Sequence, residues 1–244
     1  MQRHGEADRA TNEMSEESDR KIVQRRWSIE SVAIAGIVYA VVASAALLFM
    51  LDFPKPDLPD AELDAWFADS GNRWRLLMGL NLGTLSAAAF LWFVAVLRNR
   101  VGDREDRFFG TVFYGSAIMY AVLWITGLAA LAAIPAAIEL FDVEMRVDSS
   151  AVGTTGGIAA ALLFVAVPRI QALFVLSTST IFLRTNAAPK WLAYVGYAFG
   201  IALFIVPVIA TPVGLGFPIW VFVASVTVLV TKRVEDDADA GNAS

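Results

Sequence analysis

Long apolar runs separated by short polar segments set the pattern of this chain. Six runs are long enough to suggest helices, at about residues 29–51, 73–97, 108–134, 150–184, 190–210 and 218–231. They lack the alternation of half-buried strands, and a helix satisfies its own backbone polar groups in lipid. The sequence therefore predicts an all-α, polytopic transmembrane helix bundle of six spans in one domain, residues 27–233. Residues 1–26 are predicted as a disordered tail and residues 234–244 as an acidic tail.

The fourth run, Ser150–Arg184, is the longest. As one helix its residues would extend roughly 52 Å, more than the roughly 30 Å hydrocarbon core of a bilayer. Pro168 and Arg169 lie together near its middle, and a proline inside a helix removes one backbone donor. We therefore expect one overlong fourth helix that is kinked near Pro168.

The polar segments between the runs predict loops and one short helix. In Pro59–Asp69, the residues Leu63, Trp66 and Phe67 have helical spacing on one face, which suggests either a surface helix or a lid packed over the bundle. Pro135 is expected to end the third span, and Pro135–Ser149 to form an acidic loop. Lys232-Arg233 is expected to end the sixth span.

Composition and charge agree with a membrane location and suggest an orientation. The chain is 57% hydrophobic and 18% charged, whereas soluble domains are about 45–50% apolar and about 25% charged. Placing the N-terminus in the cytoplasm puts most arginines and lysines on the cytoplasmic side. The prediction is a multi-pass protein of a bacterial plasma membrane with both termini in the cytoplasm.

Few residue types suited to catalysis are available. The chain has no cysteine, and its single histidine, His4, lies in the polar N-terminal segment. The sequence shows no phosphate-binding glycine loop, nucleophile elbow or metal-ligand spacing, and no basic patch for nucleic acid. We therefore expect a non-enzymatic accessory, structural or sensing protein with no catalytic residues, no metal, no cofactor and no nucleic-acid partner.

Arg169 is the most informative single residue, because an arginine in an apolar helix is expensive and often functional. Counted from Arg184, it lies roughly 22 Å along the helix, in the outer half of the bilayer. Three interpretations remain. Its side chain reaches the outer headgroups or pairs with an outer acid; it lines a polar cavity that holds a small anion or lipid headgroup; or it forms an oligomer interface. The acids available for pairing are Asp69, Glu139, Asp142 and Glu144.

Hydroxyl residues follow Arg169 in the same helix, at Ser177, Thr178, Ser179 and Thr180. In membrane helices such hydroxyls most often bond to their own helix or to a neighbouring one. Asn81, in the second span, is the expected partner from another helix. The alternative function is a small-solute or lipid-handling transporter or channel in which Arg169, Ser177, Ser179 and Asn81 contact the solute.

Three glycine pairs have the GxxxG spacing that allows close helix packing: Gly79/Gly83, Gly153/Gly157 and Gly196/Gly200. They predict a tight bundle. They also offer faces through which the chain would form a homo-oligomer.

Two stretches resemble a known group of proteins. They are Phe90–Tyr120, with its charged hinge RNRVGDREDR, and Ile170–Gly196, with the run STSTIFLRT. Both are similar to a group of uncharacterised six-span integral membrane proteins of actinobacteria, and the likeness extends from the second span to the sixth. The resemblance implies a membrane location and a six-span topology; no activity or functional residue follows from it.

Overall fold

The computed structural model describes residues 34–101, 107–141, 145–185, 188–205 and 215–242. These residues are almost all helical, and no strand occurs among them. The predicted all-α class is therefore confirmed. The predicted tail 1–26 and most of the segment 211–217, between the fifth and sixth predicted runs, lie outside the described residues.

Within the described residues, six apolar helices build the bundle, and three of them are long and apolar enough to cross a membrane. The long ones are Ser70–Arg98 within α3 (Ser70–Val101), Phe108–Leu131 within α4 (Arg107–Leu131), and Ser149–Thr185. The shorter ones are Ile34–Met50, α8 (Lys190–Ile205) and Gly216–Val230 within α10 (Gly216–Asn242). Each falls on one of the six predicted apolar runs.

The helix Ser149–Thr185 is continuous but changes its hydrogen-bonding pattern once. It consists of α6 (Ser149–Ala160), the π-helical segment η2 (Ala161–Ala166) and α7 (Val167–Thr185). Asp148 caps its start, with its carboxylate accepting a bond from the backbone N–H of Ala151. The sequence places the irregularity at Pro168, and the structure places the wide turns directly before it.

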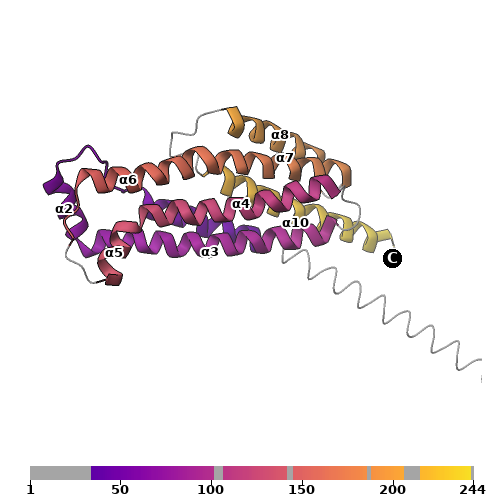
Figure 1. Cartoon of the computed structure of the whole chain (residues 1–244). Helices are drawn as coiled ribbons and strands as arrows, with labels where there is room; N and C mark the ends of the chain where they lie inside the picture. The colour runs from indigo at the N-terminus through magenta and orange to yellow at the C-terminus, as the bar shows by residue number, and fades with distance from the viewer. Residues whose placement is uncertain (1–33, 102–106, 142–144, 186–187, 206–214, 243–244) are drawn as a thin grey trace, which may run out of the picture.

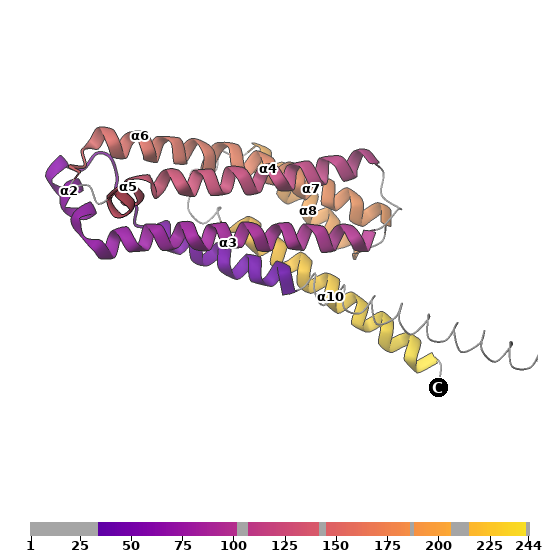
Figure 2. The same ribbon diagram turned by 60° about the horizontal axis from the view of Figure 1, so that its bottom comes forward.

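Figures 1 and 2 show the helices running along one common direction, with α8 and α10 beside the half of the bundle away from α2. The short helices α2 (Asp60–Ala68) and α5 (Ala133–Phe141) lie at the opposite end. We call the end that holds α2 and α5 the α2 end, and the other end of the bundle the far end. The core runs through the whole bundle and contains large aromatic side chains from different helices, among them Tyr39, Phe90, Tyr120, Phe174 and Phe217.

The α2 helix confirms the amphipathic segment predicted at Pro59–Asp69. Leu63 and Phe67 are buried in the common core, and Trp66 packs against it. Asp64 accepts a hydrogen bond from the backbone N–H of Val147 at 3.1 Å. Of the two expectations, a free surface helix or a packed lid, the structure therefore shows the packed lid.

One predicted boundary is wrong, and one helix extends past the residues expected to end its span. Pro135 does not end the third span: α4 ends at Leu131, and Pro135 lies in the first turn of α5, where its missing N–H has little cost. Much of the expected acidic loop is therefore helical. The apolar part of the sixth helix ends at Val230, close to the predicted end of the sixth span. The helix itself continues past Lys232-Arg233 to Asn242, because no proline or glycine interrupts the residues that follow until Gly241.

Candidate functional site

Arg169 lies where the long helix changes from π to α geometry. In η2 the hydrogen bonds span five residues, as in the bond from the backbone N–H of Val167 to the carbonyl of Leu162. Pro168 has no N–H to donate to Phe164, four residues earlier. The guanidinium of Arg169 supplies donors there, since its Nη1 lies 2.9 Å from the Val165 oxygen and 3.4 Å from the Phe164 oxygen. The arginine side chain thus donates to two carbonyls of its own helix, one of which, that of Phe164, cannot receive a bond from Pro168.

The acids expected to pair with Arg169 have other partners or lie outside the described residues. Glu139 accepts from Arg73 at 2.7 Å, and Asp69 accepts from the backbone N–H of Gly71 at 2.8 Å. Asp142 and Glu144 are not among the described residues. Within the part of the chain that the structure describes, the polar contacts of Arg169 are those with its own helix.

The neighbouring helix α4 is shaped to receive η2. Gly127 faces the wide turns, and a methyl group added there would lie 2.5 Å from Cδ2 and 2.6 Å from Cγ of Leu163. Real carbon contacts do not come this close, so the absence of a side chain at Gly127 is what lets the two helices approach. A π-helical segment is often found at a functional position.

The hydroxyl cluster Ser177–Thr180 bonds to its own helix. Each of the four hydroxyls donates to a main-chain carbonyl three or four residues earlier, at 2.7–3.0 Å. Ser177, Thr178 and Ser179 are buried. One contact reaches another helix, between Thr180 and the hydroxyl of Tyr197 on α8 at 2.7 Å. The common behaviour of hydroxyls in membrane helices is therefore the one found here.

Asn81 does not meet this cluster. Its side-chain amide is exposed and donates to the carbonyl of Leu77, one turn earlier on α3, at 2.8 Å. The interhelical bond expected from the sequence is therefore not formed. The structure brings Arg169, Ser177 and Ser179 together only as residues of one helix and places Asn81 apart from them.

The glycine pairs are used mainly inside the chain. Gly79 packs against Met50, Gly83 against Leu128, Gly196 against Ser179 and Gly200 against Leu176. Gly153 faces Pro56, and Gly157 has open space around its missing side chain. Two of the three pairs are therefore filled by the chain's own residues, which fits the predicted tight packing.

A buried polar pair that the sequence reading did not identify lies in the core. The hydroxyls of Tyr39 and Tyr120 are 2.7 Å apart. The ring of Phe90 packs between the two tyrosines, with its centroid 5.0 Å from Tyr39 and 4.9 Å from Tyr120. The signal in the sequence was a tyrosine within each of two mainly apolar runs. The pair links the helix Ile34–Met50 to α4.

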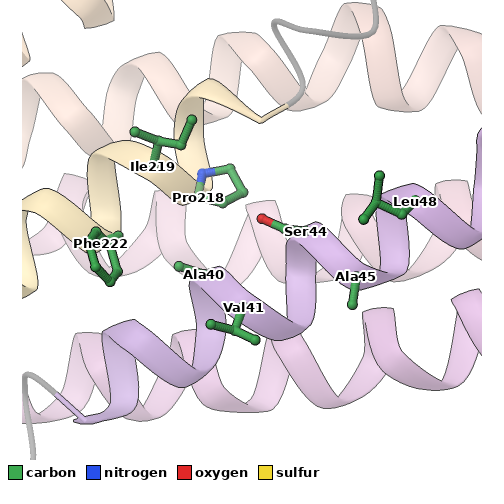
Figure 3. Close-up of a pocket in the computed structure, with 8 residues that line it drawn as sticks. All are labelled: Ala40, Val41, Ser44, Ala45, Leu48, Pro218, Ile219 and Phe222. Atoms are coloured by element: carbon green, nitrogen blue, oxygen red, sulfur yellow. The ribbon is translucent and has the colours of Figure 1, made fainter.

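An open apolar groove of about 410 Å³ lies between the helix Ile34–Met50 and the start of α10 (Figure 3). Its lining contains one polar side chain, that of Ser44. The others are Ala40, Val41, Ala45, Leu48, Pro218, Ile219 and Phe222. A groove of this composition is suited to apolar contacts, and it contains none of the residues singled out from the sequence.

No family model, curated protein or solved structure matches this chain. Among the described residues, no three His, Cys, Asp or Glu side chains gather closely enough to hold a metal ion.

Proposed function

We propose that this chain is a multi-pass protein of a bacterial plasma membrane, with six spans and both termini on the cytoplasmic side. The three long apolar helices and the three shorter ones all contribute to one core, which supports a single bundle. Arg98 and Arg184 both lie at the far end, where their guanidinium carbons stand 5.3 Å and 4.6 Å from the ring centroids of Tyr114 and Phe109. In the proposed topology, twelve lysines and arginines belong to the segments on the side of the far end, against four on the side of the α2 end, Lys55, Arg73, Arg75 and Arg146. This excess favours the far end as the cytoplasmic one.

We further propose a non-enzymatic accessory, structural or sensing role. One observation carries this proposal: the polar side chains in the best candidate site are bonded to their own helix. Arg169, Ser177 and Ser179 donate to carbonyls of the helix Ser149–Thr185, and Asn81 to a carbonyl of α3. Polar groups bonded in this way support helix packing in lipid and have less capacity left for a solute.

The alternative is a small-solute or lipid-handling transporter, and one observation favours it. Wide helical turns stand directly before Arg169, and a π segment often marks a functional position. In that case the guanidinium would leave the carbonyls of Phe164 and Val165 to bind a small anion or a lipid phosphate.

The test compares wild-type protein with Arg169→Ala, both purified in mild detergent, by native mass spectrometry and phosphorus analysis. For the structural role we expect the same amount of co-purified lipid and anion in both proteins. Arg75→Ala is the matched control, because Arg75 also lies in an apolar helix but pairs with Asp52 at the α2 end. Loss of a bound lipid or anion from Arg169→Ala alone would favour the transporter and contradict the structural proposal.

A further inference from the structure

The short helix α5 carries two exposed apolar side chains at its C-terminal tip. Leu140 is 77% exposed and Phe141 is 74% exposed, the two highest values among the large hydrophobic residues that the structure describes. The first turn of α5 is anchored, since Ile134 and Pro135 are buried. Figure 1 shows α5 leaving the line of α4 at the same end of the bundle as α2. Its tip therefore points away from the core and presents apolar groups.

The charge next to this tip is turned toward the protein. Oε1 of Glu139 accepts from Nε of Arg73 at 2.7 Å. The same guanidinium donates to the carbonyls of Phe67 and Ala68, at the end of α2, and its side chain is only 15% exposed. The ion pair holds α5 at the level of Arg73 on α3. It also leaves Leu140 and Phe141 as the groups that face outward.

Two tryptophans on α3 mark where that level lies relative to a bilayer. Trp74 follows Arg73 directly and is 56% exposed, and Trp92 is 60% exposed. They are 18 positions apart in α3, which is roughly 27 Å along the helix. This matches the roughly 30 Å hydrocarbon core, and exposed tryptophans are enriched at both of its boundaries. Trp74 thus lies at one boundary of the hydrocarbon core, and α5 lies at the same level.

The length of α4 gives the same level independently. Its 25 residues extend roughly 37 Å, enough to cross the hydrocarbon from the far end. Side chains along its outer surface are apolar and exposed, including Ile118 and Val122. The helix ends at Leu131, and α5 begins two residues later. Acidic residues of α2 such as Asp60 and Glu62 are exposed beyond this level, as expected of a segment in water.

We propose that α5 is an interfacial anchor, lying in the headgroup region at the α2 end with Leu140 and Phe141 inserted among the acyl chains of that leaflet. The partner is the phospholipid bilayer itself. Amphipathic helices bury their apolar groups about 5–10 Å into this boundary. The inference rests on the proposed membrane-spanning bundle, but it can fail while the spans remain.

The chain contains no cysteine, so single nitroxide labels can be attached without removing native thiols. Three variants are reconstituted in phosphatidylethanolamine–phosphatidylglycerol vesicles: Phe141→Cys, Ile118→Cys on the outer surface of α4, and Ala65→Cys on the exposed side of α2. Electron paramagnetic resonance then measures collisions with oxygen, which concentrates in lipid, and with a water-soluble nickel chelate. We expect oxygen to dominate strongly at position 118, the nickel chelate at position 65, and oxygen at position 141 with a shallower depth than at 118.

Each other outcome overturns a stated part of the proposal. A label at position 141 that collides with the nickel chelate as often as the label at 65, while 118 stays in lipid, would remove the anchor and leave the spans. Low collision with both reagents at 141 would mean that a second copy or another protein covers the tip, and the lipid contact would then be wrong. A label at 118 that is open to the nickel chelate would overturn the membrane-spanning proposal together with the anchor.

Discussion

Replacing Gly127 with alanine should destabilise the bundle through one identifiable contact. Gly127 of α4 faces the π-helical segment, where the added methyl group would lie 2.5 Å and 2.6 Å from Cδ2 and Cγ of Leu163. A rotation of the leucine side chain can move Cδ2, but Cγ is fixed more closely to the backbone. We therefore expect α4 and η2 to separate slightly.

The size of the effect follows from two opposing terms. Overpacking a close contact costs about 1–3 kcal/mol. Replacing glycine by alanine inside a helix gains about 0.5–1 kcal/mol, because glycine loses more backbone freedom on folding. The expected net effect of Gly127→Ala is a loss of about 0–2.5 kcal/mol, and its difference from a glycine-to-alanine change without the collision is the overpacking cost of about 1–3 kcal/mol. For chains of 150–250 residues this corresponds to about 2–4 °C in Tm per kcal/mol.

Gly115→Ala is the matched control, because Gly115 lies in the same helix and a methyl group there would meet nothing within 4 Å. We expect this control to be neutral or slightly stabilising. Both variants can be measured by circular dichroism during thermal unfolding in detergent and during titration with sodium dodecyl sulfate.

A second substitution tests whether Leu163 causes the loss. Leu163→Ala in the Gly127→Ala protein removes the colliding atoms, so the two substitutions should be coupled favourably by about 1–3 kcal/mol, within the range for residues in contact. The reasoning is refuted if Gly127→Ala and Gly115→Ala unfold alike, or if the two effects at Gly127 and Leu163 simply add.

Two further predictions concern other polar contacts. Tyr39→Phe and Tyr120→Phe should each destabilise the bundle. A double-mutant cycle in detergent should give a coupling free energy of about 0.6–1.7 kcal/mol, as measured for interhelical hydrogen bonds in membranes. Strictly additive effects of the two substitutions would contradict the hydrogen bond. Asp64→Ala should loosen the α2 lid, because the backbone N–H of Val147 loses its acceptor. Limited proteolysis of α2 should then accelerate, whereas the exposed Glu62→Ala should leave the rate unchanged.

Much of the architecture could be predicted from hydrophobic pattern alone. The apolar runs place all six main helices, and the spacing of Leu63, Trp66 and Phe67 predicts α2. These predictions succeed because apolar side chains must be buried in protein or lipid wherever they occur. The continuous helix Ser149–Thr185 follows for the same reason, despite the proline near its middle.

The details that were missed depend on partners distant in sequence. We expected Pro135 to end a span, but in the structure it lies in the first turn of α5. A proline is found both after the end of a helix and in the first turn of the next one, and the sequence around Pro135 does not distinguish the two positions. From the sequence we expected Asn81 to bond to another helix, yet its side chain donates to the carbonyl of Leu77 in its own helix. The Tyr39–Tyr120 pair joins residues 81 positions apart, which no local pattern reveals.

The distribution of polar contacts suggests how the register of the bundle is set. Most hydroxyls and Asn81 bond to their own helices, and such bonds are satisfied whatever the neighbouring helix does. In the part of the core that the structure describes, polar contacts between helices are fewer. They include the Tyr39–Tyr120 pair, Thr180 with Tyr197, and the indole N–H of Trp124, which lies 3.2 Å from the Gly83 carbonyl. Apolar side chains gain little from meeting each other rather than lipid. The relative alignment of neighbouring helices is therefore set by the few polar contacts between them and by the close contacts at glycine, because both form in only one alignment.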